Sequence, residues 1–229
     1  MVTQMTLRSA VLAASTALAL TLGLAATPAK ASFIVTAAAM NNSQSMSLLT
    51  PVAGTNVPVG QMILTTSIGT IHAWCMDLYH DIVIGSGQNL TYTPGSITTN
   101  FNGVTLTTSQ RNQIAGLVVY GDGLLANAAT NTVTNSAATQ LAIWSVENPG
   151  FTYSGASSDV IAQANAMIAL APTLSGNAVS LLSLSGTQGL VAEVGPNGIP
   201  ASAIPEPAAL ALLGSGLAGF GLLRRRRTA

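Results

Sequence analysis

Three helical patterns lie between two groups of strand patterns, and this order restricts the folds that are open to the chain. The helices are expected at about residues 108–120, 135–147 and 157–170. Each begins beside a hydroxyl or amide side chain that can cap free N–H groups, and each is followed closely by glycine or proline. Strands, then helices, then strands are typical of an α+β domain. We therefore expect a mainly antiparallel β-sheet with about three helices inserted.

Residues rich in Ile, Val and Thr flank these helices and predict strands. Before the helices we expect strands at 33–40, 46–50, 61–79 (two strands that turn at Gly69), 89–92 and 103–106, and after them at 179–184 and 190–194.

The N-terminal end has the pattern of a secretory signal, which predicts a signal peptide over residues 1–31. Arg8 supplies a positive charge, Ala10–Ala26 is apolar, and Ala29-Lys30-Ala31 forms a small-residue cleavage site before Ser32. An uncleaved membrane anchor is the alternative. The mature domain is expected over residues 32–195, which is long enough to bury a core.

The C-terminal end has three parts after a short Gly/Pro linker at 196–203. Pro205, Glu206 and Pro207 come first, and an uncharged run of 16 residues, Ala208–Leu223, follows them. Arg224, Arg225, Arg226 and Arg227 then close the run. The apolar run predicts a transmembrane helix, slightly short of the ~20 residues of a full span. The arginines place its C-terminal end on the cytoplasmic side.

Residues 204–229 resemble the PEP-CTERM sorting signal of Gram-negative bacteria, because all three parts of that signal are present in order. The resemblance implies export through the Sec machinery, an inner-membrane intermediate, and cleavage near Pro205-Glu206-Pro207 by an exosortase-type enzyme. It implies a final location at the cell surface or in the extracellular matrix, and a link to biofilm and exopolysaccharide production. It implies nothing about the ligand of the domain.

Charge within the expected mature domain is sparse and acidic. Arg111 is its single basic residue other than histidine, against six acids, which gives a net charge of −5. A surface of this kind does not neutralise phosphates, so we expect no nucleic-acid partner. The sequence contains no phosphate-binding loop, and we expect no cofactor.

The chain's reactive groups are concentrated between His72 and Asp81, although only 6% of all residues are charged. This stretch holds the only cysteine, Cys75, and both histidines, His72 and His80. In a strand, alternation puts Cys75 on one face with Asp77 and puts both histidines on the other face. That arrangement disfavours a metal site built from His72, Cys75, His80 and Asp81. It also disfavours a cysteine hydrolase, which needs a histidine beside its thiol.

The second expected helix carries a glutamine on an apolar face. Ala137, Gln140, Leu141 and Trp144 follow the spacing of one helix face. We therefore expect Gln140 to be buried, which is costly unless its hydrogen bonds are met. A buried thiol that faces this amide could attack the carbonyl, release ammonia and form an internal thioester. Asp77 is the candidate base for this reaction. The alternative is that Cys75 and Gln140 are ordinary core neighbours with no bond between them.

Trp74-Cys75-Met76-Asp77, together with Thr139-Gln140-Leu141-Ala142-Ile143-Trp144, resembles the TQxA-type thioester domain of Gram-positive surface adhesins. The helix motif, with Thr139, Ala142 and Trp144 around Gln140, is its specific part. The resemblance implies a bond between Cys75 and Gln140. The sorting tail departs from that family, which uses a sortase-type motif.

These features predict an exported surface or matrix protein that attaches covalently to an amine or hydroxyl on an unknown surface ligand. The alternative is a non-covalent structural protein of a biofilm or exopolysaccharide matrix, in which the crosslink only stabilises the fold. We expect no enzyme, because acyl transfer would consume the protein once.

Overall fold

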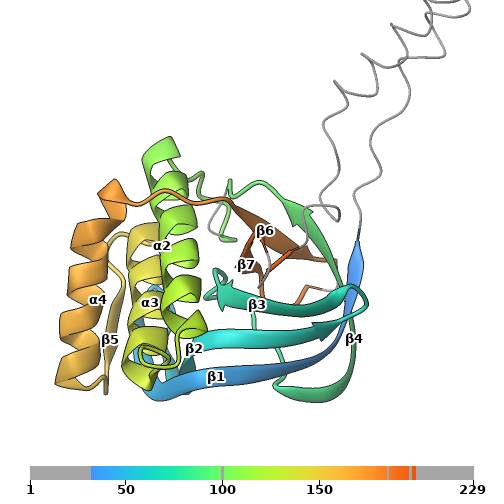
Figure 1. Ribbon diagram of the computed structural model, residues 1–229, viewed down its shortest axis with the longest axis horizontal. Helices are drawn as coiled ribbons and strands as arrows, with labels where there is room; N and C mark the ends of the chain where they lie inside the picture. Colours follow the sequence, from blue (N-terminus) through green and yellow to red (C-terminus); the bar gives the residue numbers. More distant parts are fainter. Residues whose placement is uncertain (1–31, 99–100, 185, 196–197, 200–229) are drawn as a thin grey trace, which may run out of the picture. The chain divides into compact units, whose positions relative to one another are not determined.

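The computed structural model describes residues 32–98, 101–184, 186–195 and 198–199. Its strands are β1 (Phe33–Thr50), β2 (Gly54–Thr66), β3 (Gly69–Cys75), β4 (Gly85–Gly95), β5 (Thr152–Ser154), β6 (Ala178–Ser183) and β7 (Leu190–Glu193). Its helices are α2 (Thr108–Ala126), α3 (Val133–Glu147) and α4 (Ser158–Leu170), and α4 continues into the short 3-10 turn η1 (Ala171–Thr173). The expected α+β class is therefore confirmed (Figure 1).

The strands form one antiparallel sheet in the order β2-β3-β7-β6-β4-β1-β5. A further antiparallel pairing joins β1 to β2, so six of the strands pair in a closed ring. Strand β5 lies outside this ring and pairs with the C-terminal end of β1. Register shifts in β1, such as the one between Val35 and Ala37, let one long strand serve several partners. Strand β3 thus lies inside the sheet, between β2 and β7.

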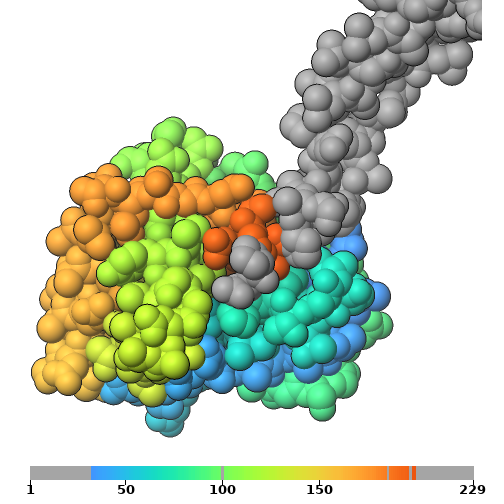
Figure 2. Space-filling view, in the orientation of Figure 1, coloured from blue at the N-terminus to red at the C-terminus, as the bar shows by residue number. Residues whose placement is uncertain are grey.

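The three helices lie side by side, with α3 between α2 and α4 (Figure 1). Side-chain oxygens of Thr107, Thr132 and Ser157 accept hydrogen bonds from backbone N–H groups in the first turn of α2, α3 and α4. Helix α3 also packs on β1 and β2. Figure 2 shows residues of α2 and α4 on the visible surface beside it. Because α3 is covered by a helix on each side and by strands, most of its residues are buried.

The core joins the helices to the sheet through large side chains, among which Trp74, Trp144 and Tyr92 are fully or almost fully buried. Helices α2 and α3 approach closely at Gly121, where a Cβ atom would clash with the side chain of Thr139. This contact explains why α2 passes through Gly121-Asp122-Gly123, the sequence that we expected to end it near Tyr120.

Several expected strands differ from the structure. The two expected at 33–40 and 46–50 form the single strand β1, and β5 was not among the expected strands. Residues 103–106 form no strand, and β3 ends at Cys75 instead of reaching Tyr79. In the part of the chain that the structure describes, no helix combines the length and apolar character needed to span a membrane. The signal helix expected in 1–31 and the transmembrane helix expected in 204–229 lie outside the described residues.

Candidate functional site

The side chain of Gln140, from the middle of α3, lies against the backbone of Cys75 at the end of β3. Gln140 is 1% exposed, so its expected inward direction is confirmed. The Cys75 N–H donates to Gln140 Oε1 at 2.8 Å, and Gln140 Nε2 donates to the Cys75 carbonyl oxygen at 2.8 Å. These two bonds meet the needs of a buried amide. They also hold its carbonyl carbon next to the residue that bears the only thiol of the chain.

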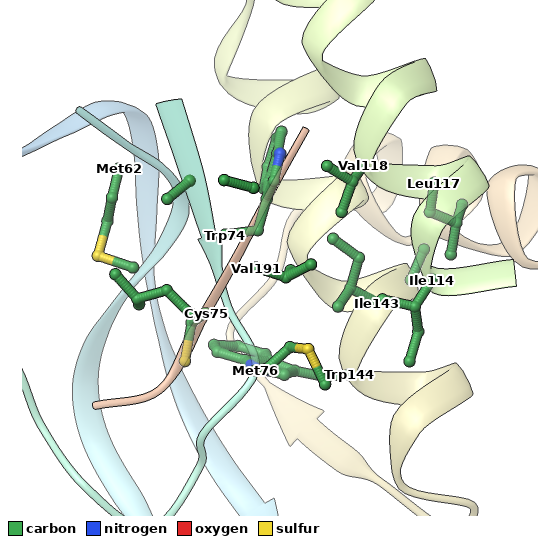
Figure 3. Close-up of a cluster of buried hydrophobic side chains, with 14 of the residues drawn as sticks. Met62, Trp74, Cys75, Met76, Ile114, Leu117, Val118, Ile143, Trp144 and Val191 are labelled. Atoms are coloured by element: carbon green, nitrogen blue, oxygen red, sulfur yellow. The ribbon is translucent and has the colours of Figure 1, made fainter. Parts of the chain in front are cut away.

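The Cys75 sulfur is enclosed, with the residue 4% exposed. The thiol donates to the Asp77 carbonyl oxygen at 3.2 Å, and Gln188 Nε2 donates to the sulfur at 2.8 Å. Figure 3 shows Cys75 and Trp144 within one cluster of buried side chains. Gln188 is 113 residues from Cys75 in the chain. No local pattern could have pointed to it, and the sequence analysis missed it.

The pKa of the Cys75 thiol is raised well above its ordinary value, chiefly by burial and next by the negative charge of Glu147. The Trp144 indole N–H, which faces the sulfur, opposes this shift. The neutral thiol is therefore the favoured form, and a proton must be removed before the sulfur can act as a strong nucleophile.

Asp77 is 1% exposed, and its carboxylate holds a turn together. Oδ1 accepts from the backbone N–H groups of Tyr79 at 2.8 Å and His80 at 3.2 Å. Oδ2 lies 2.7 Å from His80 Nδ1 and accepts from the Gly189 N–H at 3.3 Å. The candidate base of the sequence analysis therefore contacts the sulfur through its carbonyl group, while its carboxylate contacts His80.

The turn at Asp77 shows that the predicted position of His80, on a strand face opposite Cys75, is wrong. Alternation was extended through residue 80, but β3 ends at Cys75, and the Asp77 carboxylate bends the chain back. His80, with a side chain 50% exposed, is thereby joined to Asp77 and not placed on a strand face opposite Cys75. His72 remains on β3. Among the described residues, no three metal-ligating side chains form a cluster.

Two cavities that share lining residues lie at the site. The smaller, of about 80 Å³, is lined by Cys75 and Gln140. The larger, of about 360 Å³, is lined by Asp77 and His80. Both are also lined by Val57, Pro58, Asp81, Trp144 and Gln188. The shared residues place the larger cavity beside the one that the thiol and the amide line.

Glu147 is a second group that the sequence analysis missed, although it lies seven residues after Gln140 on the same face of α3. It is 1% exposed. Its pKa is raised well above the ordinary value by burial and then by the charge of Asp77, while the side chain of Asn148 opposes the shift. The site thus holds a second buried acid, whose protonated form is favoured by burial.

This arrangement suits acyl chemistry. The Cys75 N–H is a fixed donor to Gln140 Oε1, where negative charge would develop if a nucleophile added to the carbonyl carbon. The Gln188 amide would stabilise a thiolate as it forms on Cys75. Gln140, Cys75 and Gln188 therefore supply an electrophile, a nucleophile and two hydrogen-bond donors in one buried place.

Solved structures similar to this chain include two thioester domains. One is the N-terminal thioester domain of a surface protein from Clostridium perfringens, at 14% identity and a TM-score of 0.45, covering 58% of this chain and 86% of that one. The other is the N-terminal thioester domain of the fibronectin-binding protein SfbI from Streptococcus pyogenes, at 14% identity and a TM-score of 0.41, covering 74% and 96%. At these values, neither structure supports a conclusion about what the present chain does.

No curated protein sequence matches the chain. Its C-terminal end, however, matches a sequence family. Residues 203–227 match the PEP-CTERM protein-sorting motif, which implies processing by an exosortase-type enzyme and supports export to the cell surface.

Proposed function

We propose that Cys75 and Gln140 form an internal thioester and that the chain is an exported surface adhesin that uses this bond to attach covalently to its ligand. One observation carries the proposal. The Gln140 carboxamide is held by two 2.8 Å hydrogen bonds on the backbone of Cys75, inside a cavity that both residues line.

Formation of the bond is a balanced condensation. The Cys75 sulfur adds to the Gln140 carbonyl carbon, and the Cys75 N–H stabilises the oxyanion. The carbon–nitrogen bond then breaks, and Nε2 leaves as ammonia with the proton that the thiol loses. Because the thiol is the favoured form, that proton must pass to a neighbouring group first. Neither an oxidant nor a cofactor is required.

The bond is then a stored electrophile. An amine or hydroxyl of the ligand attacks the Gln140 carbonyl carbon, the thiol of Cys75 is released, and an amide or ester joins the ligand to the protein. The cavity of about 80 Å³ gives a small nucleophilic group a place beside the bond. Each molecule reacts once, so the protein is not an enzyme that turns over.

The segments of the chain, taken from the N-terminus to the C-terminus, fit this role. Residues 1–31 direct export through the Sec machinery, 32–195 form the thioester-like ectodomain, and 196–203 link it to the sorting signal. Residues 204–229 hold the chain in the inner membrane of a Gram-negative bacterium until an exosortase-type enzyme releases it to the surface or matrix. The match at 203–227 supports this sequence of events.

A structural crosslink is the second candidate, and the low exposure of Cys75 favours it. By the chain-entropy argument for disulfides, a bond across 65 residues stabilises the fold by about 4 kcal/mol. In this alternative the protein supports a biofilm or exopolysaccharide matrix without covalent attachment. The two candidates differ in whether an added amine can open the bond.

The test is the intact mass of the purified chain, compared with the sequence mass between the same termini. We expect a deficit of one ammonia, a Cys75 that resists thiol reagents, and uptake of methylamine on residue 140 with release of the thiol. Cys75→Ser and Gln140→Ala should abolish all three. Gln61→Ala, which removes another fully buried glutamine, should abolish none.

A native mass equal to the sequence mass, with Cys75 titratable before treatment, would contradict the proposed bond. A deficit that persists without any amine uptake would favour the structural crosslink over the adhesin.

A further inference from the structure

The second feature of the site, besides the thiol and the amide, is the pairing of His80 with Asp77 at the wall of the larger cavity. Building on the proposed thioester, we propose that His80 is the base that activates an incoming hydroxyl group, so that the site forms esters with hydroxyl-bearing ligands such as carbohydrates.

The pair is built as an oriented imidazole. Asp77 is held by the N–H groups of Tyr79, His80 and Gly189, so its carboxylate cannot turn away. A carboxylate only accepts hydrogen bonds, so the His80 Nδ1 at 2.7 Å must carry the hydrogen. The other ring nitrogen, Nε2, is then the basic one.

The position of the pair also fits. His80 and Asp77 line the cavity of about 360 Å³. This cavity shares the Asp81, Trp144 and Gln188 walls with the cavity of Cys75 and Gln140. Gln188 bridges the two parts directly, because its Nε2 donates both to the Cys75 sulfur at 2.8 Å and to the Asp77 carbonyl oxygen at 3.2 Å. The cavity that His80 lines therefore lies beside the cavity of the proposed bond.

The other titratable groups that face this space are Asp77, Tyr79 and Asp81. Asp77 is already committed to the turn and to His80. Within the described residues, no lysine or arginine lines the cavity. His80 is therefore the group in this wall that suits proton removal, because its ring keeps one nitrogen free to accept a proton when the other is bonded to Asp77.

The two classes of nucleophile need such a base to different extents. A free amine attacks a thioester without losing its proton beforehand. An alcohol is a weak nucleophile until a base takes its proton in the transition state. A positioned base usually contributes about a hundredfold or more to such a step. An imidazole in this wall thus matters most for hydroxyl groups.

The proposed step balances. The hydroxyl oxygen bonds to the Gln140 carbonyl carbon as His80 Nε2 takes its proton, and the carbon–sulfur bond breaks. The leaving Cys75 sulfur then receives that proton from His80. The products are one ester and one thiol, and His80 ends in its starting state. Asp77 acts as a positioning residue throughout.

The experiment compares His80→Gln with wild type, using the full chain, and takes His72→Gln as the matched control because His72 lines neither cavity. Glycerol is the hydroxyl probe and methylamine, as its free base, is the amine probe. Intact mass follows both adducts, and hydroxylamine distinguishes the ester by cleaving it. We expect His80→Gln to keep the ammonia deficit and methylamine uptake but to form the glycerol ester about a hundredfold more slowly.

His72→Gln should react as wild type does. Free imidazole added to His80→Ala should restore ester formation, which a merely structural role of His80 would not allow. Ester formation by His80→Gln at the wild-type rate would overturn the inference, as would equal losses with both probes. A wild-type chain without the ammonia deficit would instead refute the proposed thioester itself, so the two failures are distinguishable.

Discussion

Two buried glutamines lie where the helices meet the sheet, and they differ in what surrounds them. The Gln61 side chain donates to Asp122 Oδ1 at 2.7 Å and accepts from Asn41 at 2.9 Å. Gln140 also has two partners, both on the backbone of Cys75. Each amide is satisfied and almost fully buried.

The two glutamines differ in whether a thiol lies beside them and in whether the cavity opens on them. Around Gln61, Asp122 Oδ1 also accepts from the Trp74 indole at 2.9 Å, so this cluster consists of nitrogen and oxygen partners. Around Gln140 there is a sulfur atom, and a cavity of about 80 Å³ opens on both residues. Burial and hydrogen bonding are therefore alike for the two glutamines. Under the proposed function, the neighbouring thiol and the cavity are what would make Gln140 reactive and leave Gln61 structural.

The largest expected effect concerns stability. If Cys75 and Gln140 are joined, Cys75→Ser and Gln140→Ala should each lower the free energy of unfolding by about 4 kcal/mol. The double variant should cost little more than either change, because both remove one bond. Urea denaturation measures all three. Combining Cys75→Ser with Gln61→Ala should give nearly additive losses, and additive losses for the Cys75 and Gln140 pair would rule out the bond.

The next largest effect is a pH dependence of stability that arises from Asp122 in the Gln61 cluster. Burial raises the pKa of Asp122 from 3.8 to about 7, although Trp74 and Gln61 donate to it. The folded state thus keeps a proton that the unfolded chain has lost, so stability should fall as pH rises from about 4 to about 7. The expected fall is about 2 kcal/mol between about pH 4 and about pH 6.

Asp122→Asn removes this titration, so denaturation curves measured across that range should flatten. The change keeps an oxygen that Trp74 and Gln61 can reach. A pH dependence identical to that of wild type would mean that Asp122 is ionised in the folded protein. In that outcome, the Gln61 cluster would be charged rather than neutral at pH 6.

A smaller effect concerns the thiol itself. Glu147 raises the pKa of Cys75 through its negative charge. In a Gln140→Ala background, where the thiol is not joined to residue 140, Glu147→Gln should therefore lower the pH at which Cys75 reacts with a thiol reagent. Asp159→Asn, at an exposed acid of α4, is the control and should leave that pH unchanged. An unshifted profile in Glu147→Gln would show that Glu147 does not act on the sulfur.

Much of the fold was predictable because it depends on local periodicity. The face of α3 that carries Gln140 and Trp144 follows from the helical repeat alone, and both residues are buried. The pairing of β3 with β7, which brings Gln188 to Cys75, depends on residues more than 100 positions apart and had no local signal.

Two errors have identifiable physical causes. Alternation was carried past Cys75, although an aspartate two residues before a backbone N–H is a common turn former, as Asp77 is for Tyr79. The sequence pattern predicts a helix end at Gly121, although its lack of a side chain serves the contact of α2 with Thr139. Asp77 forms a turn where a continued strand was expected, and Gly121 allows a close helix contact where a helix end was expected. His80 and Asp122 were misplaced as a result.

The smallest expected effect is that of deleting the C-terminal tail, which should leave the Gln61 and Gln140 clusters unchanged. Deleting Ala208–Ala229 removes the apolar run and the arginines, while both glutamine clusters lie within residues 41–188. The truncated chain should therefore keep a single cooperative thermal transition at the wild-type midpoint, together with the ammonia deficit, and should be released from the membrane fraction. Replacing the four arginines with glutamine is the control, because it removes the charges but keeps the apolar run. A broadened or lowered transition in the deletion variant would mean that the tail contributes to the fold, and the boundary proposed at residues 196–203 would then be wrong.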